Sequence, residues 1–282
     1  MPELAIVTDS TAYIPADIGS KYKIHVAPQV LIWDGEEMED GVDIMPPEFY
    51  ARLKTSKTMP TTSQATIASF KIIFEPLVAR GVPILAILIS PKLSGTIQSA
   101  EQAKQMFPGA KIEIVNSESV AMALGYQVLA AARAAEAGAS FEEVVAVAEG
   151  ARAHTGVVFL VDTLEFLHRG GRIGGAARFL GSALNLKPLL EVRDGRVEPL
   201  EKVRTRAKAR ERLLEVVEER VKGKSKLRLA TLHASSEEDA AALLAEAVGR
   251  LHPVEHMLTA VSPVVGTHAG PGTIGLAYCT EI

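Results

Sequence analysis

Short apolar runs alternate with amphipathic stretches through the first half of the chain. Four runs are apolar enough to be buried strands, and the stretches between them carry apolar residues at helical spacing. The predicted strands are residues 4–8, 24–30, 84–89 and 111–115, and the predicted helices are 15–22, 46–53, 65–78, 96–107, 120–137 and 141–153. This alternation predicts a parallel sheet that is covered by helices on both faces.

The order of predicted elements changes after residue 155, where strands follow one another with fewer helices between them. The predicted strands are 157–161, 189–193, 196–203, 227–233, 255–261 and 274–280, and the predicted helices are 163–168, 176–184, 205–221 and 236–250. Asp194-Gly195 is a hairpin signal between two of these strands. We therefore expect an α/β protein with two domains: a parallel-sheet α/β/α domain over 1–155, and an α/β domain with a six-stranded mixed sheet over 156–282.

Hydroxyl side chains follow three strands of the first half. They occur in Asp9-Ser10-Thr11, in Ser94-Gly95-Thr96, and at Ser117 and Ser119. The carboxyl ends of parallel strands meet at one edge of a sheet, which is where such sheets bind ligands. A further cluster, Thr61-Thr62-Ser63, has more hydroxyls than the capping of one helix requires.

A glycine-rich stretch near the end of the chain contains a single histidine. Residues 266–273, with His268 among three glycines and a proline, separate two strand-like runs at 257–265 and 274–280. The pattern predicts a tight loop that can bring backbone N–H groups and an imidazole to a small anionic group. An ordinary hairpin turn explains the same residues without a ligand.

Acidic residues are concentrated between residues 34 and 43, with no basic residue among them. They are Asp34, Glu36, Glu37, Glu39, Asp40 and Asp43. Their spacing does not match the alternating ligands of a calcium loop, so we interpret the segment as a solvated loop and expect no metal site.

The composition narrows the class of protein. Hydrophobic residues make up 48% and charged residues 23%, which is typical of a soluble globular chain, and the net charge of -4 gives no general reason to expect nucleic-acid binding. Cys279 is the single cysteine, which excludes an internal disulfide. Neither a signal-peptide pattern nor an apolar run of about 20 residues occurs, so we expect a cytoplasmic protein.

Five motifs in order along the chain give a more specific indication. They are Asp9-Ser10-Thr11, Thr62-Ser63-Gln64, Leu93-Ser94-Gly95-Thr96, residues 164–167 followed by 169–173, and His268-Ala269-Gly270-Pro271-Gly272. Together they resemble the DegV family over the whole chain. The resemblance implies the same two-domain fold, with a long-chain fatty acid bound between the domains.

The resemblance also implies a partner. In bacteria with a fatty acid kinase, members of the family act as its acyl-carrying subunit, FakB. The carboxylate is presented to a separate ATP-using subunit, FakA, which makes acyl phosphate for phospholipid synthesis. We therefore expect a lipid-binding subunit that is not catalytic alone, and that has no cofactor and no nucleic-acid partner. A transient contact with a membrane surface fits this role.

The site residues follow from the same resemblance. Thr62, Ser94 and His268 would bind the carboxylate, and a protonated His268 would suit an anion. The residues expected to support these ligands from behind are Ser10, Thr96 and Ser119, and those expected to face the kinase are Arg172 and Arg204. Ala65-Thr66 departs from the Pro-Ser of many relatives, which should shift a helix cap and leave Thr62 in place.

The acyl chain requires an apolar tunnel. The candidate lining residues are Phe166, Ile173, Phe179 and Leu184, with Leu167, Leu180 and Leu186 nearby, although core packing explains each equally well. Burial of each methylene is worth about 0.8 kcal/mol. A chain of about C16–C18 would therefore gain more than about 10 kcal/mol before the losses of association.

Three other functions use some of the same residues. A hydrolase would use Ser94 as nucleophile, His268 as base and Asp9 as orienter, but Ser94 lacks the Gly-x-Ser-x-Gly elbow. A phosphate-ligand binder could use the glycine loops. A redox or nucleotide enzyme is a third alternative, but the sequence contains neither a dinucleotide-binding fingerprint nor a reactive cysteine.

Overall fold

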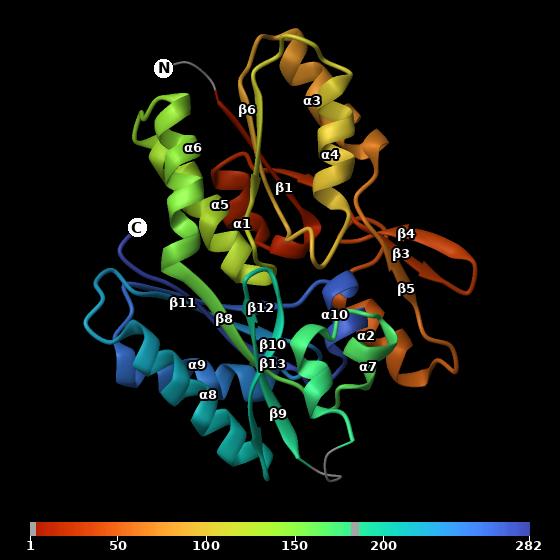
Figure 1. Cartoon of the computed structure of the whole chain (residues 1–282), viewed down its shortest axis with the longest axis vertical. Helices are drawn as coiled ribbons and strands as arrows, with labels where there is room; N and C mark the ends of the chain where they lie inside the picture. The colour runs from red at the N-terminus through yellow and green to blue at the C-terminus, as the bar shows by residue number, and fades with distance from the viewer. Residues whose placement is uncertain (1–3, 182–185) are drawn as a thin grey trace.

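Two β-sheets and the helices around them form the body of the protein. The computed structural model describes residues 4–181 and 186–282. In Figure 1 the sheet built from the first half of the chain stands in the upper part of the view and the sheet built from the second half in the lower part. In the described residues, no helix is both long and apolar enough to cross a membrane.

The upper sheet has four parallel strands in the order β2-β1-β6-β7. The strands are β1 (Ala5–Asp9), β2 (His25–Ala27), β6 (Ile84–Leu88) and β7 (Ile112–Asn116). The helices around them are α1 (Ala16–Lys21), α3 (Ile67–Ala79), α4 (Thr96–Gln105), α5 (Ala121–Glu136) and α6 (Phe141–Gly150). A short 3-10 turn, η1 (Ser10–Ala12), follows β1. The parallel sheet that the alternating pattern of the first half predicts is thus confirmed.

Both faces of this sheet are buried because successive side chains of a strand point in opposite directions. In β6, Ile84 and Ala86 pack with the apolar side chains of α3 and α4. Leu85 and Ile87 pack on the other face with those of α5 and α6. The continuous apolar run of β6 is therefore explained by helices on both sides.

The lower sheet has six strands in the order β10-β9-β8-β13-β11-β12, and only β11 and β12 are parallel neighbours. The strands are β8 (Thr155–Leu160), β9 (Lys187–Arg193), β10 (Arg196–Val203), β11 (Arg228–His233), β12 (Glu255–Ala260) and β13 (Ile274–Cys279). A 3-10 turn, η2 (Ala151–His154), leads into β8. The predicted six-stranded mixed sheet is confirmed, whereas the domain boundary at residue 155 stays a prediction.

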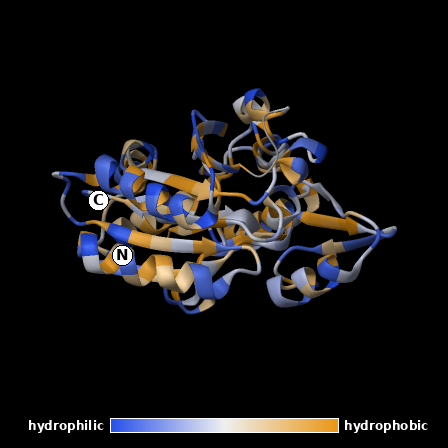
Figure 2. Ribbon diagram, turned by 90° about the horizontal axis from the view of Figure 1, so that it is seen from below, coloured by the Kyte–Doolittle hydropathy of each residue, from blue (hydrophilic) through white to orange (hydrophobic). Residues whose placement is uncertain are grey.

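Helices α8 (Arg206–Val221) and α9 (Glu237–Leu251) cover one face of the lower sheet. Figure 2 shows helices that carry both hydrophilic and hydrophobic positions, as expected for elements with one buried side. The opposite face of the sheet packs against α5. All residues of α5 from Ala121 to Ala132 are buried, because this helix lies between the two sheets.

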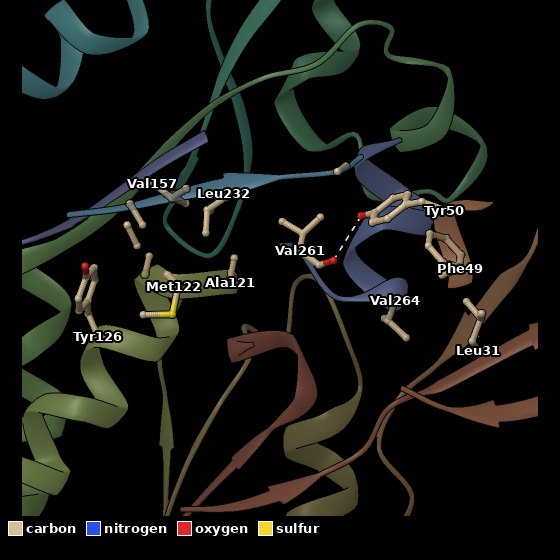
Figure 3. Close-up of a cluster of buried hydrophobic side chains, with 14 of the residues drawn as sticks. Leu31, Phe49, Tyr50, Ala121, Met122, Tyr126, Val157, Leu232, Val261 and Val264 are labelled. Atoms are coloured by element: carbon tan, nitrogen blue, oxygen red, sulfur yellow. Dashed lines mark hydrogen bonds between the residues drawn. The ribbon is translucent and has the colours of Figure 1, made fainter. Parts of the chain in front are cut away.

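Figure 3 shows the apolar cluster at this junction. Met122 and Tyr126 of α5 lie close to Val157 of β8 and Leu232 of β11. The small side chains of α5 let the helix fit between two sheets, since Ala and Gly occupy about half of its positions. One helix of the first half therefore forms part of the core of the second half.

A third sheet was not predicted. It contains β3 (Val30–Trp33), β4 (Glu36–Glu39) and β5 (Thr61–Ser63) in the order β4-β3-β5, and all neighbours are antiparallel. Helix α2 (Pro46–Thr55) connects β4 to β5 along the chain. Asp34 and Gly35 form the tight turn between β3 and β4, both with positive φ (56° and 83°). The acidic segment is thus largely a hairpin, and the hydroxyl cluster at 61–63 is a strand.

The interpretation of the acidic segment as solvated is wrong at Asp40. Its side chain is 1% exposed, and Oδ2 accepts a 2.7 Å hydrogen bond from the Ser10 hydroxyl. Burial raises the pKa of Asp40 to about 7, although the neighbouring Ser10, Ser262 and Val264 N–H oppose the shift. The described residues contain no group of three or more His, Cys, Asp or Glu that could hold a metal ion.

Two further predictions of local structure are wrong. His268 lies on a helix, α10 (Pro263–Ala269), where a loop was expected. Ser262 caps this helix by accepting a hydrogen bond from Val265 N–H, and Pro263 occupies the first turn, so the strand before it ends at Ala260. After α7 (Glu165–Arg169), the expected helix at 176–184 is instead a 3-10 turn, η3 (Gly174–Phe179), within the described residues.

Candidate functional site

A cavity lies between the two main sheets, next to α5 and α10. It has about 840 Å³ of empty space, its opening to solvent included. Most of its lining is apolar and comes from both halves of the chain. The apolar lining residues are Ile89, Leu93, Val120, Ala121, Val157, Phe159, Leu167, Val192, Val197, Leu232, Val261, Val264, Val265 and Ala269.

Thr62 and His268, which both line the cavity, contact each other. Thr62 lies on β5, opposite Leu31 of β3, and His268 lies in the last turn of α10. The Thr62 hydroxyl is 2.8 Å from His268 Nε2. This hydrogen bond joins the third sheet to α10, so two segments separated by 206 residues meet at the cavity.

The far side of the imidazole is closely covered. A Cβ atom on Gly170 would lie 2.0 Å from His268 Nδ1, so only glycine fits at this position. Nδ1 is buried and has no hydrogen-bond partner among the described residues. The imidazole therefore has one ring nitrogen engaged by Thr62 and the other enclosed by backbone.

Ser94 and Gln29 form the neighbouring polar wall. The Ser94 hydroxyl is 2.9 Å from the Thr96 hydroxyl and 3.5 Å from Gln29 Oε1. Gln29 Nε2 in turn donates to Asp9 Oδ1 at 3.3 Å. Asp9 is fully buried and also accepts hydrogen bonds from the Thr11 and Ile89 N–H groups. The hydroxyl loops after β1 and β6 thus meet at one edge of the sheet, as their positions predicted.

The surroundings of His268 favour the neutral imidazole. Burial and, to a smaller extent, the positive charge of Arg172 lower the pKa of His268 to about 4. That His268 is protonated beside a bound anion stays a prediction. A neutral imidazole can donate or accept one hydrogen bond at Nε2, but it supplies no charge to an anion.

Comparison with known proteins identifies the family. A family model described as "Uncharacterised protein, DegV family" matches residues 3–281. Protein DegV of Bacillus subtilis is 34% identical over 277 residues, which cover 98% of this chain and 99% of that protein. A DegV domain-containing protein of Streptomyces coelicolor is 38% identical over 99% of both chains. The chain belongs to the DegV family.

Solved structures of DegV proteins have the same fold. A structure described as "Fatty Acid Binding of a DegV family Protein from Thermus thermophilus" is 36% identical, with a TM-score of 0.94 over 99% of this chain and 100% of that chain. The B. subtilis structure, described as DegV, a fatty acid binding protein, has a TM-score of 0.90 at 32% identity over 100% of both chains. A stearic acid-binding protein of Eubacterium ventriosum has a TM-score of 0.92 at 26% identity over 98% of both chains.

Three residues that the DegV resemblance assigned to the carboxylate, Thr62, Ser94 and His268, all line the cavity. Thr96 is behind Ser94, in contact with its hydroxyl. The helix cap after Gln64 falls on Thr66, whose hydroxyl accepts from Ser69 N–H in a capping box. The departure from the family pattern at 65–66 thus leaves Thr62 on the cavity wall.

Other residues predicted from the DegV resemblance lie away from the cavity wall. The Ser10 hydroxyl donates to Asp40 Oδ2 and accepts a hydrogen bond from the Gln29 N–H. Ser10 is therefore linked to the cavity wall through the backbone of Gln29. Ser119 contributes its backbone carbonyl to Ser117 and Ser90. Arg204 is exposed.

Of the residues predicted to line the acyl chain, Leu167 lines the cavity. Phe166, Ile173 and Phe179 are not among the cavity-lining residues. The Phe166 ring lies against Gly270, and Phe179 stacks under Lys202. Ile173 packs in a small apolar cluster beside the cavity. Leu184 lies outside the described residues. The rest of the lining comes from one face of the lower sheet, from the loop after β6, and from residues of α5 and α10.

The hydrolase alternative is not favoured by the geometry. His268 Nε2 contacts Thr62, and no hydrogen bond joins it to Ser94 in the described part of the chain. Asp9 bonds Thr11, Gln29 and Ile89, so it does not orient His268. A nucleophile, base and orienter need a continuous chain of hydrogen bonds, which these residues lack.

Gln29 and Arg172 are cavity-lining residues that the sequence did not assign to the ligand. Gln29 is 2% exposed and stands in a short segment between two strands, where nothing in the apolar pattern distinguishes it. Arg172 was expected to face a partner. Its guanidinium turns inward, with Nε donating to Leu93 O at 3.0 Å and Nη1 to Gly170 O at 2.7 Å.

Proposed function

We propose that this protein binds a long-chain fatty acid of about C16–C18 in the cavity between its two sheets. The observation that carries the proposal is the cavity itself, which is mostly apolar and has Thr62, Ser94 and His268 on its wall. The fatty-acid-binding DegV structures of T. thermophilus and B. subtilis support it, since each covers essentially the whole chain.

Thr62, Ser94 and His268 would hold the carboxylate. A buried carboxylate is costly unless its oxygens accept hydrogen bonds, and the Thr62 and Ser94 hydroxyls can donate them. The contact between Thr62 and His268 supports this role, because a His268 Nε2–H that donates to the Thr62 hydroxyl at 2.8 Å leaves the hydroxyl proton for the carboxylate. Thr96 would hold the Ser94 hydroxyl from behind.

The apolar lining would take the acyl chain. Each methylene removed from water contributes about 0.8 kcal/mol, so a chain of about 16 carbons gains more than about 10 kcal/mol before the losses of association. Ala121 and Gly275 belong to this lining and leave room because they have little or no side chain. Binding of this strength would let the lipid copurify with the protein.

We further propose that the protein is the FakB-like subunit of a fatty acid kinase, in the cytoplasm. It would present the carboxylate to an ATP-using subunit resembling FakA, which forms the acyl phosphate, and it would not be catalytic alone. Exposed Arg204 is the residue we expect to face that subunit. The test is to mix the loaded protein, the kinase subunit and ATP and to assay for acyl phosphate. Its absence, with a kinase shown to be active on another carrier, would contradict this role.

The binding proposal is tested by lipid retention in two variants. Ser94→Ala and His268→Ala each remove one proposed donor and should weaken retention of a C16–C18 acid by about tenfold, since a hydrogen bond to a charged group is worth about 1.5–3 kcal/mol. Far-ultraviolet circular dichroism should show both variants folded. Wild-type retention in both would refute the proposed head-group site.

A further inference from the structure

Asp40 is a buried carboxyl that lies behind the cavity wall. It is 1% exposed and is not one of the lining residues. Its Oδ2 accepts a 2.7 Å hydrogen bond from the Ser10 hydroxyl, whereas Oδ1 is buried without a hydrogen-bond partner among the described residues. The charged group that acts on it most strongly is another carboxyl, that of Asp9. Since a buried carboxylate is costly in such surroundings, the protonated form of Asp40 is favoured here.

Asp40 joins parts of the chain that form different walls of the cavity. On one side, the Ser10 hydroxyl donates to Asp40 and accepts from the Gln29 N–H at 3.1 Å. The Asp40 N–H also donates to the Gln29 carbonyl at 2.8 Å. On the other side, Ser262 and the Val264 N–H in the first turn of α10 lie near enough to act on the carboxyl. Gln29 and Val264 both line the cavity, so Asp40 lies where the two halves of the chain meet behind it.

The deep part of the cavity is closed to solvent in this structure. Ala121, Val157 and Leu232 line it and are each at most 6% exposed. Water itself barely reaches these side chains, so a wider methylene chain reaches them when the two halves of the chain move apart. Separation of α10 from the turn η1 would also expose Asp40 to water, which restores the ordinary acidity of its carboxyl. Opening of the cavity and ionisation of Asp40 are therefore linked.

We propose that Asp40 is a proton-controlled latch of the cavity: when protonated it holds α10 against η1, and when ionised it favours their separation. Asp40 is a positioning residue, because it acts on the cavity walls and not on the ligand. The inference rests on the proposed binding of a fatty acid in this cavity and adds a control of its release. Its consequence is that the lipid leaves faster as pH rises through the range in which Asp40 ionises.

The size of the effect follows from the linkage between opening and proton release. Burial raises the pKa of Asp40 from 3.8 to about 7 in the closed protein, although Ser10, Ser262 and the Val264 N–H oppose the shift. In an opened, hydrated state the carboxyl has its ordinary pKa, so the closed state binds more protons between these values and rising pH favours opening. From pH 6 to pH 8 the opening equilibrium should increase about tenfold through Asp40 alone, and it should level off above that range.

Other ionisable side chains face Asp40 from the elements packed against it. Burial raises the pKa of Tyr13, after η1, to about 12 and that of Tyr50, on α2, well above its usual value, so both stay neutral below pH 9. Burial also raises the pKa of Asp9, at the end of β1, and lowers that of His268, in the last turn of α10, to about 4. A substitution at Asp40 leaves all of these groups in place, so the difference between wild type and variant isolates Asp40.

The experiment measures how fast radiolabelled palmitic acid leaves the protein for excess serum albumin at pH 6, 7 and 8. The proteins are the wild type, Asp40→Asn and Asp43→Asn. Asparagine has the shape of the protonated carboxyl and cannot ionise, so Asp40→Asn should keep the latch closed. Asp43→Asn is the matched control, because Asp43 is an exposed carboxylate three residues along the chain, where it accepts a hydrogen bond from the Glu39 N–H.

We expect the ratio of the two release rate constants, wild type over Asp40→Asn, to rise about tenfold from pH 6 to pH 8. Asp43→Asn should follow the wild type at each pH. A ratio of wild type to Asp40→Asn that stays constant within about twofold would overturn the inference. Wild-type protein that takes up no palmitic acid at any of these pH values would instead overturn the proposed function.

Two measurements on the ligand-free wild type depend neither on the variant nor on the lipid. The carboxyl carbon of Asp40 should titrate near pH 7 in NMR spectra. Protection of the Gln29 and Val264 amides from hydrogen exchange, corrected for the intrinsic pH dependence of exchange, should fall from pH 6 to pH 8, because these amides flank the latch. An Asp40 that titrates near pH 4, or amide protection that does not change with pH, would overturn the inference.

Discussion

Gly170→Ala is a single-methyl change that should disable the head-group site. Gly170 has φ -75° and ψ -6°, a backbone conformation that alanine adopts freely. The only cost is therefore steric. The new Cβ would lie 2.0 Å from His268 Nδ1, 2.8 Å from its Cε1 and 3.2 Å from the carbonyl oxygen of Phe166.

The size of the effect follows from these distances. Cβ atoms essentially never approach another heavy atom within 3.0 Å, so the imidazole must move by at least about 1 Å. A shift of that size takes the 2.8 Å contact between His268 Nε2 and Thr62 out of hydrogen-bond range. Loss of a hydrogen bond between buried groups costs about 1–3 kcal/mol, which corresponds to about 5- to 150-fold in affinity.

Gly150→Ala is the matched control. Gly150 also has a helical backbone, with φ -65° and ψ -31°, and a Cβ there meets no atom within 4 Å. This control should bind the fatty acid as the wild type does and be equally or slightly more stable, because alanine restricts the unfolded chain. Equal dissociation constants for Gly170→Ala and wild type, measured by isothermal titration calorimetry, would refute the assigned position of His268.

Further changes test other parts of the site. Thr62→Val removes the hydroxyl on His268 Nε2 and should weaken fatty-acid retention about tenfold; an unchanged dissociation constant would contradict the role of Thr62. Because the pKa of His268 is lowered from 6.5 to about 4, the unfolded chain binds the extra proton in that window, so the free energy of unfolding should fall by about 3 kcal/mol as pH falls through it. His268→Gln should remove this fall in urea titrations at several pH values. Asp40 has the opposite sign: its pKa is raised from 3.8 to about 7, so the free energy of unfolding should fall as pH rises through that window, and Asp40→Asn should abolish that slope. For each residue, the same dependence of the free energy of unfolding on pH in the wild type and in the variant would contradict the claim. Gly275→Val would place a Cβ 3.1 Å from the Phe159 Cβ and should shift binding toward shorter chains in a competition among acids of different length; an unchanged preference would show that the chain does not pass Gly275.

The strands of the upper sheet were predictable because a strand that is buried on both faces has a continuous run of apolar residues. The run at 84–89 is apolar at every position up to its last residue, and β6 is covered on both sides by helices. The hydroxyls after β1 and β6 were predicted to meet for a geometric reason, since parallel strands end at a common edge. These two regularities located Ser94 without any knowledge of the ligand.

Two short sequence signals indicate elements that the apolar pattern does not predict. Ser262-Pro263 is an N-cap followed by a proline in the first turn, which indicates the start of α10 rather than the continuation of a strand. Asp34-Gly35 is a two-residue hairpin turn, which indicates β3 and β4. Glycines in α10 obscured the helix, although Gly266 is there because the Tyr50 hydroxyl packs against its Cα.

The lining of the cavity could not have been read from the sequence. Val157 and Leu232 look like any other residues of a buried strand, and whether such residues face core or cavity depends on how two sheets are spaced across α5. The same holds for Arg172, whose inward direction depends on two backbone carbonyls from distant segments. Pattern indicates which residues are buried, but not what they are buried against.

Native mass spectrometry of the purified protein tests the central claim most directly. The account predicts a species heavier than the chain by the mass of a fatty acid of about C16–C18, which organic extraction then releases and identifies. A clean mass for the unliganded chain that stays unchanged after free fatty acid is added would contradict the account.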